Sequence, residues 1–353
     1  MTNTATVFLT PAIYDTAWAP PKLVTSSGDE YVDAYDYATA QFMAAAVAQT
    51  YIQTDDRVLP RKFKERIIMT PGNSAARLVT IGSVPPSGDD KRLTIVVAIR
   101  GTESMSDWGA NFDFNVIKNP WSSSSSGGVI HGGFMRWYAY DSASIYHENP
   151  KNTTTFITVC VIVALVFFLL GLTRVVDEGQ ADKTTRTYWC TVAVAAVSII
   201  LVLWVTLVAA MAGDSSGDTL ATLIKTTIDD IVEEPGTWKR DWRRNGKPLN
   251  VIVAGHSLGA SAAQLCAVDL SHYLGQRRKF TSLSISCYAF APPRTGDVFF
   301  NRWLHVNQGW GRSPDRGMFS FVHPDDLVSM TPLPGFGAEF VTCGHEYLLN
   351  ACT

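Results

Sequence analysis

Short apolar runs alternate with polar, glycine-rich segments along the chain, and their lengths predict the elements of the fold. Residues 93–99 and 251–254 are β-branched runs of the kind that fill buried parallel strands. Residues 220–232 carry leucine, isoleucine and valine at helical spacing, which predicts an amphipathic helix. Further expected elements are a helix over residues 32–52, strands near 66–69, 77–82, 282–290 and 318–322, and a flexible Ser/Gly loop over 122–128.

The order of these elements indicates the fold class. Strands that alternate with helices along a chain predict a mostly parallel sheet with helices on both faces, which is the α/β class. The chain has 353 residues, which is enough for one large domain of this kind. We therefore expect a single α/β domain that contains most of the chain.

Two long apolar runs interrupt this pattern. Residues 156–172 and 188–211 have lengths that suit helices spanning a bilayer, and neither run has the polar stripe of a core helix. They predict a transmembrane hairpin, with a pair of buried core helices as the alternative. The expected organisation is an N-terminal part of the α/β domain (1–150), the inserted hairpin (151–213) and a C-terminal part (214–353).

Composition narrows the classes of function. A net charge of −3 gives no reason to expect a nucleic-acid partner. The six cysteines form neither a disulfide framework nor a metal-ligand pattern, and we expect no metal and no other cofactor. The start of the chain lacks the basic residues and apolar core of a signal peptide. We therefore expect a membrane protein with two spans and a cytosolic α/β domain. The alternative is the opposite orientation, which the basic residues Arg174, Lys183 and Arg186 between the two runs favour.

The segment that says most about chemistry is Gly-His-Ser-Leu-Gly at residues 255–259. It follows an expected buried strand and precedes an apolar helix, so it fits the G-x-S-x-G turn that lifts a serine hydroxyl above a sheet edge. Ser257 is therefore the candidate nucleophile, and His256 inside the turn is expected to pack structurally. Residues 213–217 fit the same pattern around Ser215, but no strand precedes them, which favours a flexible linker.

Several ordered motifs surround Ser257. Serine hydrolases of this type have the chain order Ser, Asp, His, and residues 322–328 and 343–347 supply an acid and an imidazole in that order. Outside the hairpin, most of the chain resembles the fungal-type triacylglycerol lipases, the class 3 lipases. Five segments carry the resemblance. The first two are Ile-Arg-Gly-Thr-Glu-Ser at 99–104, with Asp107, Trp108 and Asn111 after it, and His-Gly-Gly-Phe at 131–134. The other three are the turn at 255–259, Ala-Pro-Pro-Arg-Thr-Gly-Asp at 291–297 with Phe299, and residues 322–328 with Pro332.

The resemblance implies an α/β-hydrolase fold and an oxyanion hole. The backbone N–H groups of Thr102 and Leu258 would hold the oxyanion, each contributing roughly 3–4 kcal/mol to lowering the barrier. The glycine-rich segment at 131–134 is an alternative oxyanion loop. Because the Arg-Gly-Thr segment directly follows a strong strand, Thr102 is favoured, and His131 is left with a structural role.

The resemblance also implies an acid and a base. Asp326 fits the position of the acid, and Asp325 is the alternative. In the family a histidine lies four residues before a glutamate, but here Glu346 is preceded at that distance by Thr342, which cannot act as a base. His345 is the nearest imidazole and is therefore the expected base. The alternatives are His305, His323 and a chain that has lost its base.

These observations predict a membrane-anchored, lipase-like serine hydrolase that cleaves carboxylic ester bonds of lipids, acylglycerols or phospholipids, through an acyl-enzyme on Ser257. Its partners would be a lipid ester substrate and the bilayer. Trp108, Phe112 and Phe114 lie in a lid-like segment and would present apolar surface to lipid. Thr342 supports a second hypothesis, an inert lipase-fold membrane protein for lipid binding or scaffolding. A third hypothesis is an esterase that acts on soluble substrates.

Overall fold

The structure is a computed structural model, and it divides the chain into two compact units. Met1–Ala139 and Asp218–Thr353 form the first unit, and Tyr140–Gly217 forms the second. All the residues that the structure describes belong to the first unit. They are residues 37–51, 64–68, 79–86, 91–101, 115–139, 219–277, 279–310, 315–332 and 339–349.

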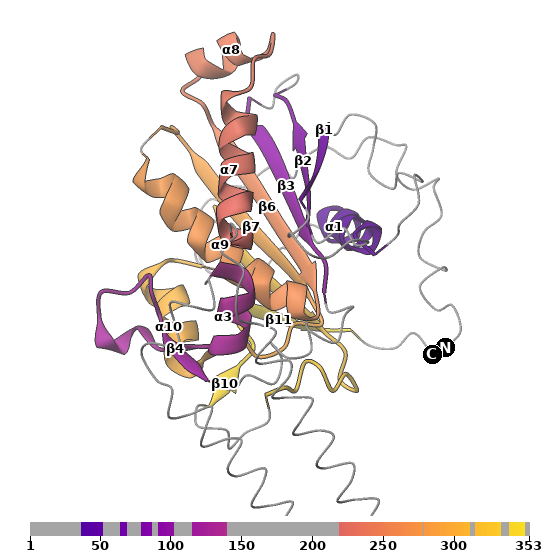
Figure 1. The fold of residues 1–353 in the computed structure, drawn as a ribbon, viewed down its shortest axis with the longest axis vertical. Helices are drawn as coiled ribbons and strands as arrows, with labels where there is room; N and C mark the ends of the chain where they lie inside the picture. The colour runs from indigo at the N-terminus through magenta and orange to yellow at the C-terminus, as the bar shows by residue number, and fades with distance from the viewer. Residues whose placement is uncertain are drawn as a thin grey trace, which may run out of the picture. The chain divides into compact units, whose positions relative to one another are not determined.

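A seven-stranded sheet lies at the centre of the first unit (Figure 1), with the strand order β1-β2-β3-β6-β7-β9-β11. Its strands are β1 (Lys64–Ile68), β2 (Val79–Val84), β3 (Leu93–Ile99), β6 (Leu249–His256), β7 (Leu283–Phe290), β9 (Arg316–Val322) and β11 (His345–Leu348). The first three strands pair antiparallel. The pairs from β3 to β11 are parallel. This mostly parallel sheet confirms the α/β class.

Helices cover both faces of this sheet (Figure 1). The expected N-terminal helix is α1 (Tyr37–Gln49), and it packs on the face that carries Val96 and Ile252. The helix after Ser257 is α9 (Leu258–Gln276), which packs against the opposite face. Every residue of β3 is buried, and so is every residue of β6 before His256. Burial on both faces is the physical reason for the continuous apolar runs in the two strands.

A second, four-stranded sheet was not predicted from the sequence. Its order is β10-β8-β5-β4, and its strands are β4 (Val116–Lys118), β5 (Val129–His131), β8 (Gly296–Asp297) and β10 (Phe340–Val341). Strands of two or three residues are too short to show a hydrophobic period. The expected loop over residues 122–128 contains a short 3-10 helix, η3 (Ser125–Gly127), which the Ser124 side chain caps.

The remaining helices connect and cover the two sheets. They are α3 (Gly132–Ala139), α7 (Leu220–Glu233), α8 (Lys239–Arg244) and α10 (Val298–Asn307). The expected amphipathic helix over residues 220–232 is α7, and the Thr219 side chain caps its first turn by accepting from the Thr222 N–H. The isoleucines of α7 are buried against the rest of the unit, which confirms the orientation that the apolar spacing predicts.

The predicted transmembrane hairpin lies outside the described residues. Within the described ranges, none of the helices combines the length and the apolar character needed to cross a bilayer. The apolar runs at 156–172 and 188–211 are not among those ranges. The hairpin and the domain boundaries at 150 and 213 therefore stay predictions.

Candidate active site

Ser257 occupies a strained turn between β6 and α9. Its backbone angles are φ 55° and ψ −127°, which a residue with a side chain rarely adopts and which persists only where the surrounding structure enforces it. The Ser257 N–H donates to the Phe290 carbonyl at 3.0 Å, and the Ala260 N–H donates to the Ser257 carbonyl at 2.8 Å. The serine side chain is half-buried. This is the strand–turn–helix geometry expected for a nucleophile.

The glycines on either side of Ser257 are required by close packing. A Cβ on Gly255 would lie 2.0 Å from the Gly259 carbonyl oxygen. A Cβ on Gly259 would lie 2.3 Å from the Arg100 carbonyl oxygen. Both contacts involve backbone atoms, which cannot rotate away as a side chain can. The two glycines therefore allow β6, α9 and the end of β3 to meet at the turn.

The end of β3 lies beside the nucleophile. A Cβ on Gly101 would lie 3.1 Å from the Ser257 Cβ, so the backbone that leads into Thr102 passes close to the serine. Leu258 is the first residue of α9, and the N–H groups of a helix's first turn have no partner within the helix. Thr102 itself lies outside the described residues. The roles of Thr102 and Leu258 at the oxyanion stay predictions.

A contact between Tyr51 and His256 links α1 to the turn. The Gly101 N–H donates to the Tyr51 hydroxyl at 2.8 Å, and the same hydroxyl is hydrogen-bonded to His256 Nδ1 at 3.0 Å. Desolvation lowers the pKa of His256 below its usual 6.5, and the carboxylate of Asp326 opposes this shift. Tyr51 is not predictable from the sequence, because nothing in its local pattern distinguishes it from other tyrosines.

Asp326 lies in the loop after β9, at the same sheet edge as Ser257. The Val328 N–H donates to its Oδ1 at 2.9 Å, and the Ser329 hydroxyl donates to its Oδ2 at 3.1 Å. These bonds fix the carboxylate near His256. The side chain of Asp325 is 92% exposed instead. The placement therefore favours Asp326 over Asp325 as the acid that orients a base.

The structure does not bring His345 to Ser257. His345 lies on the outermost strand, β11, and pairs with Phe319 of β9, which pairs with Tyr288 of β7, which pairs with Ala254 of β6. Three strand spacings of about 4.8 Å therefore separate the backbone of β11 from that of β6 by roughly 14 Å. A base must lie about 2.6–3.2 Å from the hydroxyl or act through one water. This placement argues against the predicted role of His345.

The other described histidines have distinct surroundings. His323 follows β9 at the edge that carries Ser257, and its Nδ1 accepts from the Asp325 N–H at 3.2 Å. His305 on α10 faces the His345 ring, with 5.7 Å between the ring centroids. His131 is buried in β5 and stacks on Phe134 at 4.0 Å. The burial of His131 lowers its pKa to about 3 and supports the expected structural role.

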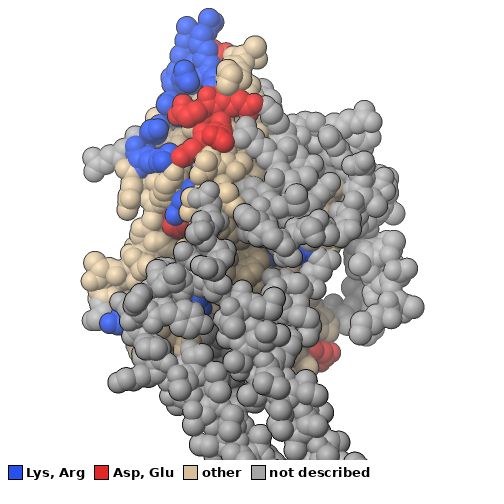
Figure 2. All heavy atoms as spheres, in the orientation of Figure 1, with Lys and Arg blue, Asp and Glu red and all other residues tan. Residues whose placement is uncertain are grey.

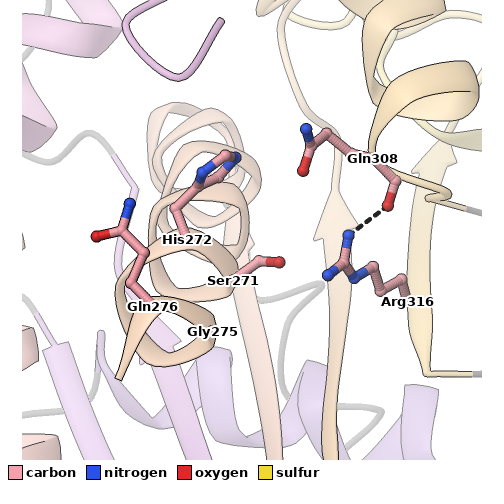
Figure 3. A pocket seen from close by; sticks show the side chains of 6 residues that line it. All are labelled: Ser271, His272, Gly275, Gln276, Gln308 and Arg316. Atoms are coloured by element: carbon pink, nitrogen blue, oxygen red, sulfur yellow. Dashed lines mark hydrogen bonds between the residues drawn. The ribbon is translucent and has the colours of Figure 1, made fainter. Parts of the chain in front are cut away.

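A cavity of about 460 Å³ lies elsewhere on α9 (Figure 3). Ser271, His272 and Gln276 line it from the helix, and Arg316 donates to the Gln308 carbonyl on its other side. Ser271 follows Ser257 by fourteen residues of the helix, which is roughly 21 Å at 1.5 Å per residue. This cavity is therefore separate from the candidate active site.

Comparison with known proteins gives a partial match to lipases. The family model described as "Lipase (class 3)" matches residues 237–336. A chloroplastic galactolipase of Arabidopsis thaliana, named DONGLE, is 34% identical over 110 residues, which cover 30% of this chain and 21% of that protein. A lipase of Rhizomucor miehei is 30% identical over 137 residues, which cover 39% of this chain and 31% of that protein.

A third relative is the secreted mono- and diacylglycerol lipase A of Penicillium cyclopium. It is 29% identical over 127 residues, which cover 36% of this chain and 35% of that protein. The chain thus spans between about a fifth and a third of the length of these relatives. The stretch that matches the family model contains both Ser257 and Asp326. The chain is therefore similar to class 3 lipases in the segment that carries the candidate nucleophile and acid.

Proposed function

We propose that the chain is a serine hydrolase that cleaves carboxylic ester bonds of lipids through an acyl-enzyme on Ser257. The observation that carries the proposal is the positive φ of Ser257 at the end of a central parallel strand. Strain of this kind in a non-glycine residue needs a reason, and presenting a nucleophile is one that fits the turn. The similarity of residues 237–336 to class 3 lipases supports the same reaction.

The proposed reaction has two steps. The Ser257 hydroxyl attacks the ester carbonyl carbon while a base takes its proton, and the alkoxy group leaves as an alcohol when that proton is returned. A water molecule then attacks the acyl-enzyme and releases the fatty acid. The N–H groups of Leu258 and Thr102 would stabilise the negative oxygen in both steps. Asp326 would hold the base in the required orientation.

Position at the sheet edge divides the candidate bases into two groups. His256 and His323 are the described imidazoles that lie at the edge carrying Ser257, whereas His345 lies on the outer strand. Substituting each of the three by asparagine, one at a time, separates them. The variant that loses reaction with a fluorophosphonate while keeping its fold identifies the base.

Exposed apolar side chains support a lipid substrate. Leu327 is 75% exposed, and Met330 follows it in the same loop. Leu348 ends β11 at the level of Val322, Leu349 follows it, and both are also exposed. Exposed apolar side chains at the sheet edge that carries the candidate nucleophile favour an acyl chain over a polar substrate. We propose acylglycerols or phospholipids as the substrate class, because the relatives are named as acylglycerol lipases and a galactolipase.

We also propose that residues 151–213 anchor the enzyme in a bilayer as a two-helix hairpin. The support is the length and apolar character of the two runs in the sequence. Extraction of membranes with alkaline carbonate tests the anchor. The full chain should stay in the membrane fraction, and its release into the supernatant would contradict the hairpin.

A second candidate function is lipid binding without catalysis. Its support is that, within the described part of the chain, no imidazole is hydrogen-bonded to the Ser257 hydroxyl. A fluorophosphonate probe separates the two functions, because it reacts only with an activated serine. Labelling that is lost in Ser257→Ala supports the hydrolase, and a folded wild type that is not labelled supports the binding protein.

A further inference from the structure

α8 gathers basic side chains around one cavity at the edge of the sheet opposite Ser257. The cavity has a volume of about 620 Å³, and its basic lining residues are Lys239, Arg240, Arg243 and Arg244. Figure 2 shows Lys and Arg side chains gathered over α8. β6 begins at Leu249, shortly after α8, and its eight residues end beside Ser257. Eight residues of strand span roughly 26 Å, so the cavity is remote from the candidate active site.

Lys239 is the unusual member of this cluster. It is only 4% exposed, and its ammonium nitrogen has no hydrogen-bond partner. The nitrogen lies over the Trp238 ring, 5.9 Å from its centroid. Burial is the main cause that lowers the pKa of Lys239, the charges of Arg243 and Lys247 lower it further, and Glu233 and Glu234 act in the opposite direction. A buried charge without a hydrogen-bonded counter-ion is unfavourable unless a ligand supplies one.

The nearby carboxylates do not fully satisfy the cluster. Glu233 lines the cavity, but it also pairs with Lys279 at 3.8 Å. Asp241 pairs with Arg244 at 3.8 Å, with both side chains largely exposed. Ion pairs of this length and exposure are weak. The cavity therefore keeps an excess of positive charge and of N–H donors.

We propose that this cavity binds a phosphate monoester group. A phosphate offers several acceptor oxygens and close to two negative charges, which match one ammonium and several guanidinium groups. The volume lies in the range of roughly 300–1,000 Å³ that is typical for small-ligand sites, so a phosphate together with part of its organic group fits. The proposal rests on the cluster alone and not on any role of Ser257.

Thermal unfolding of the full chain with inorganic phosphate tests the site. At a hundredfold excess over its dissociation constant, phosphate should raise the wild-type Tm by roughly 5 °C. Lys239→Met should remove this shift, because it deletes the buried charge while keeping the length of the side chain. Lys118→Met is the matched control: it removes an exposed lysine from β4 and should keep the full shift.

Two outcomes overturn the proposal. One is a wild type with no shift in phosphate beyond that in chloride of equal ionic strength. The other is an equal shift in Lys239→Met. If Lys239→Met does not fold, Arg243→Gln at an exposed position takes its place and should reduce the shift. Because fluorophosphonate labelling of Ser257 is measured separately, failure of this site is distinguishable from failure of the proposed hydrolase.

The source of the phosphate is distinguished by the form of the probe. Glycerol 3-phosphate offers a soluble phosphate monoester, and detergent micelles that contain phosphatidic acid offer the same group on a lipid. A site for soluble compounds should give a Tm shift that depends on Lys239 with glycerol 3-phosphate and none with phosphatidic acid. A headgroup site should give that shift with phosphatidic acid micelles only. Neither form binding through Lys239 would refute the site.

Discussion

The turn at Ser257 and the outer strand β11 each carry a residue that the sequence predicts to be catalytic. Different features of the fold fix the positions of these two residues. Ser257 lies between a strand and a helix that it directly joins, and its backbone is fixed by neighbours within a few residues and by the end of β3. His345 lies in a strand whose position depends on pairing with β9. Local packing therefore places Ser257 in the turn that its motif predicts, whereas strand order places His345 three strands away from that turn.

The two regions also differ in what surrounds them. Gly101, Gly255 and Gly259 allow three backbone segments to meet at the turn with almost no free space. β11 lies at the end of the sheet, and its side chains alternate between half-buried and exposed. A tightly packed turn has one arrangement, while an edge strand is constrained on one side only. Small substitutions should therefore lower the stability of the protein sharply in the turn and only weakly in β11.

The largest expected effect is the loss of hydrolysis in Ser257→Ala. The substitution removes the attacking oxygen, and we expect a loss of about a millionfold in turnover on a short-chain ester with the fold unchanged. Ser215→Ala, in the other Gly-x-Ser-x-Gly segment, is the control and should keep full activity. Activity that survives in Ser257→Ala but not in Ser215→Ala would show that the wrong serine was assigned.

The next largest expected effect is a pH dependence of the free energy of unfolding. It comes from His131, a buried imidazole outside both regions. The folded pKa of His131 is about 3, against 6.5 for an ordinary histidine. Above pH 6.5 both the folded and the unfolded states are neutral, and as the pH falls towards 3 only the unfolded state takes up the proton. The free energy of unfolding should therefore fall, by an upper limit of about 5 kcal/mol at pH 3.

Urea unfolding between pH 7 and pH 5 measures this slope. His131→Leu should flatten the part that His131 contributes, because leucine does not titrate. Ile130→Val alters a buried side chain next to His131 that does not titrate, and this control should keep the slope. An unchanged pH dependence in His131→Leu would contradict the buried, neutral state of His131.

Gly255→Ala should destabilise the fold by about 3 kcal/mol, measured by urea unfolding. The new Cβ would meet the Gly259 carbonyl oxygen at 2.0 Å, and relieving that overlap requires β6 and α9 to separate. The matched control is Gly275→Ala in α9, where a Cβ meets nothing within 4 Å. Alanine there should stabilise the protein by roughly 0.5–1 kcal/mol. Equal effects of the two substitutions would mean that the turn is not tightly packed.

The smallest expected effect is that of His345→Ala on turnover. Since His345 lies three strands from β6, we expect less than about a threefold change in the initial rate of hydrolysis, because a group outside hydrogen-bond reach does not transfer the proton. Thr342→His should likewise leave the rate unchanged. A loss of several powers of ten in His345→Ala would show that β11 rearranges to bring its imidazole to Ser257.

Much of the fold, together with the turn that carries the candidate nucleophile, can be predicted from the sequence. The continuous apolar runs of β3 and β6 identify strands buried on both faces, and the spacing in α7 identifies its buried face. Gly255 and Gly259 mark the turn because glycine alone fits where backbones meet. These features depend on residues that are near one another in the chain, so their physical causes are visible in a local pattern.

The tertiary structure alone decided the surroundings of Ser257. Tyr51 reaches His256 and Gly101 across a separation of 205 and 50 residues, and no local pattern indicates such a contact. The short strands β4, β5, β8 and β10 form because other strands pair with them. His345 is level with Ala254 because of the strand order. Register and strand order are set by the packing of the whole domain, and for that reason the sequence around His345 does not reveal its distance from Ser257.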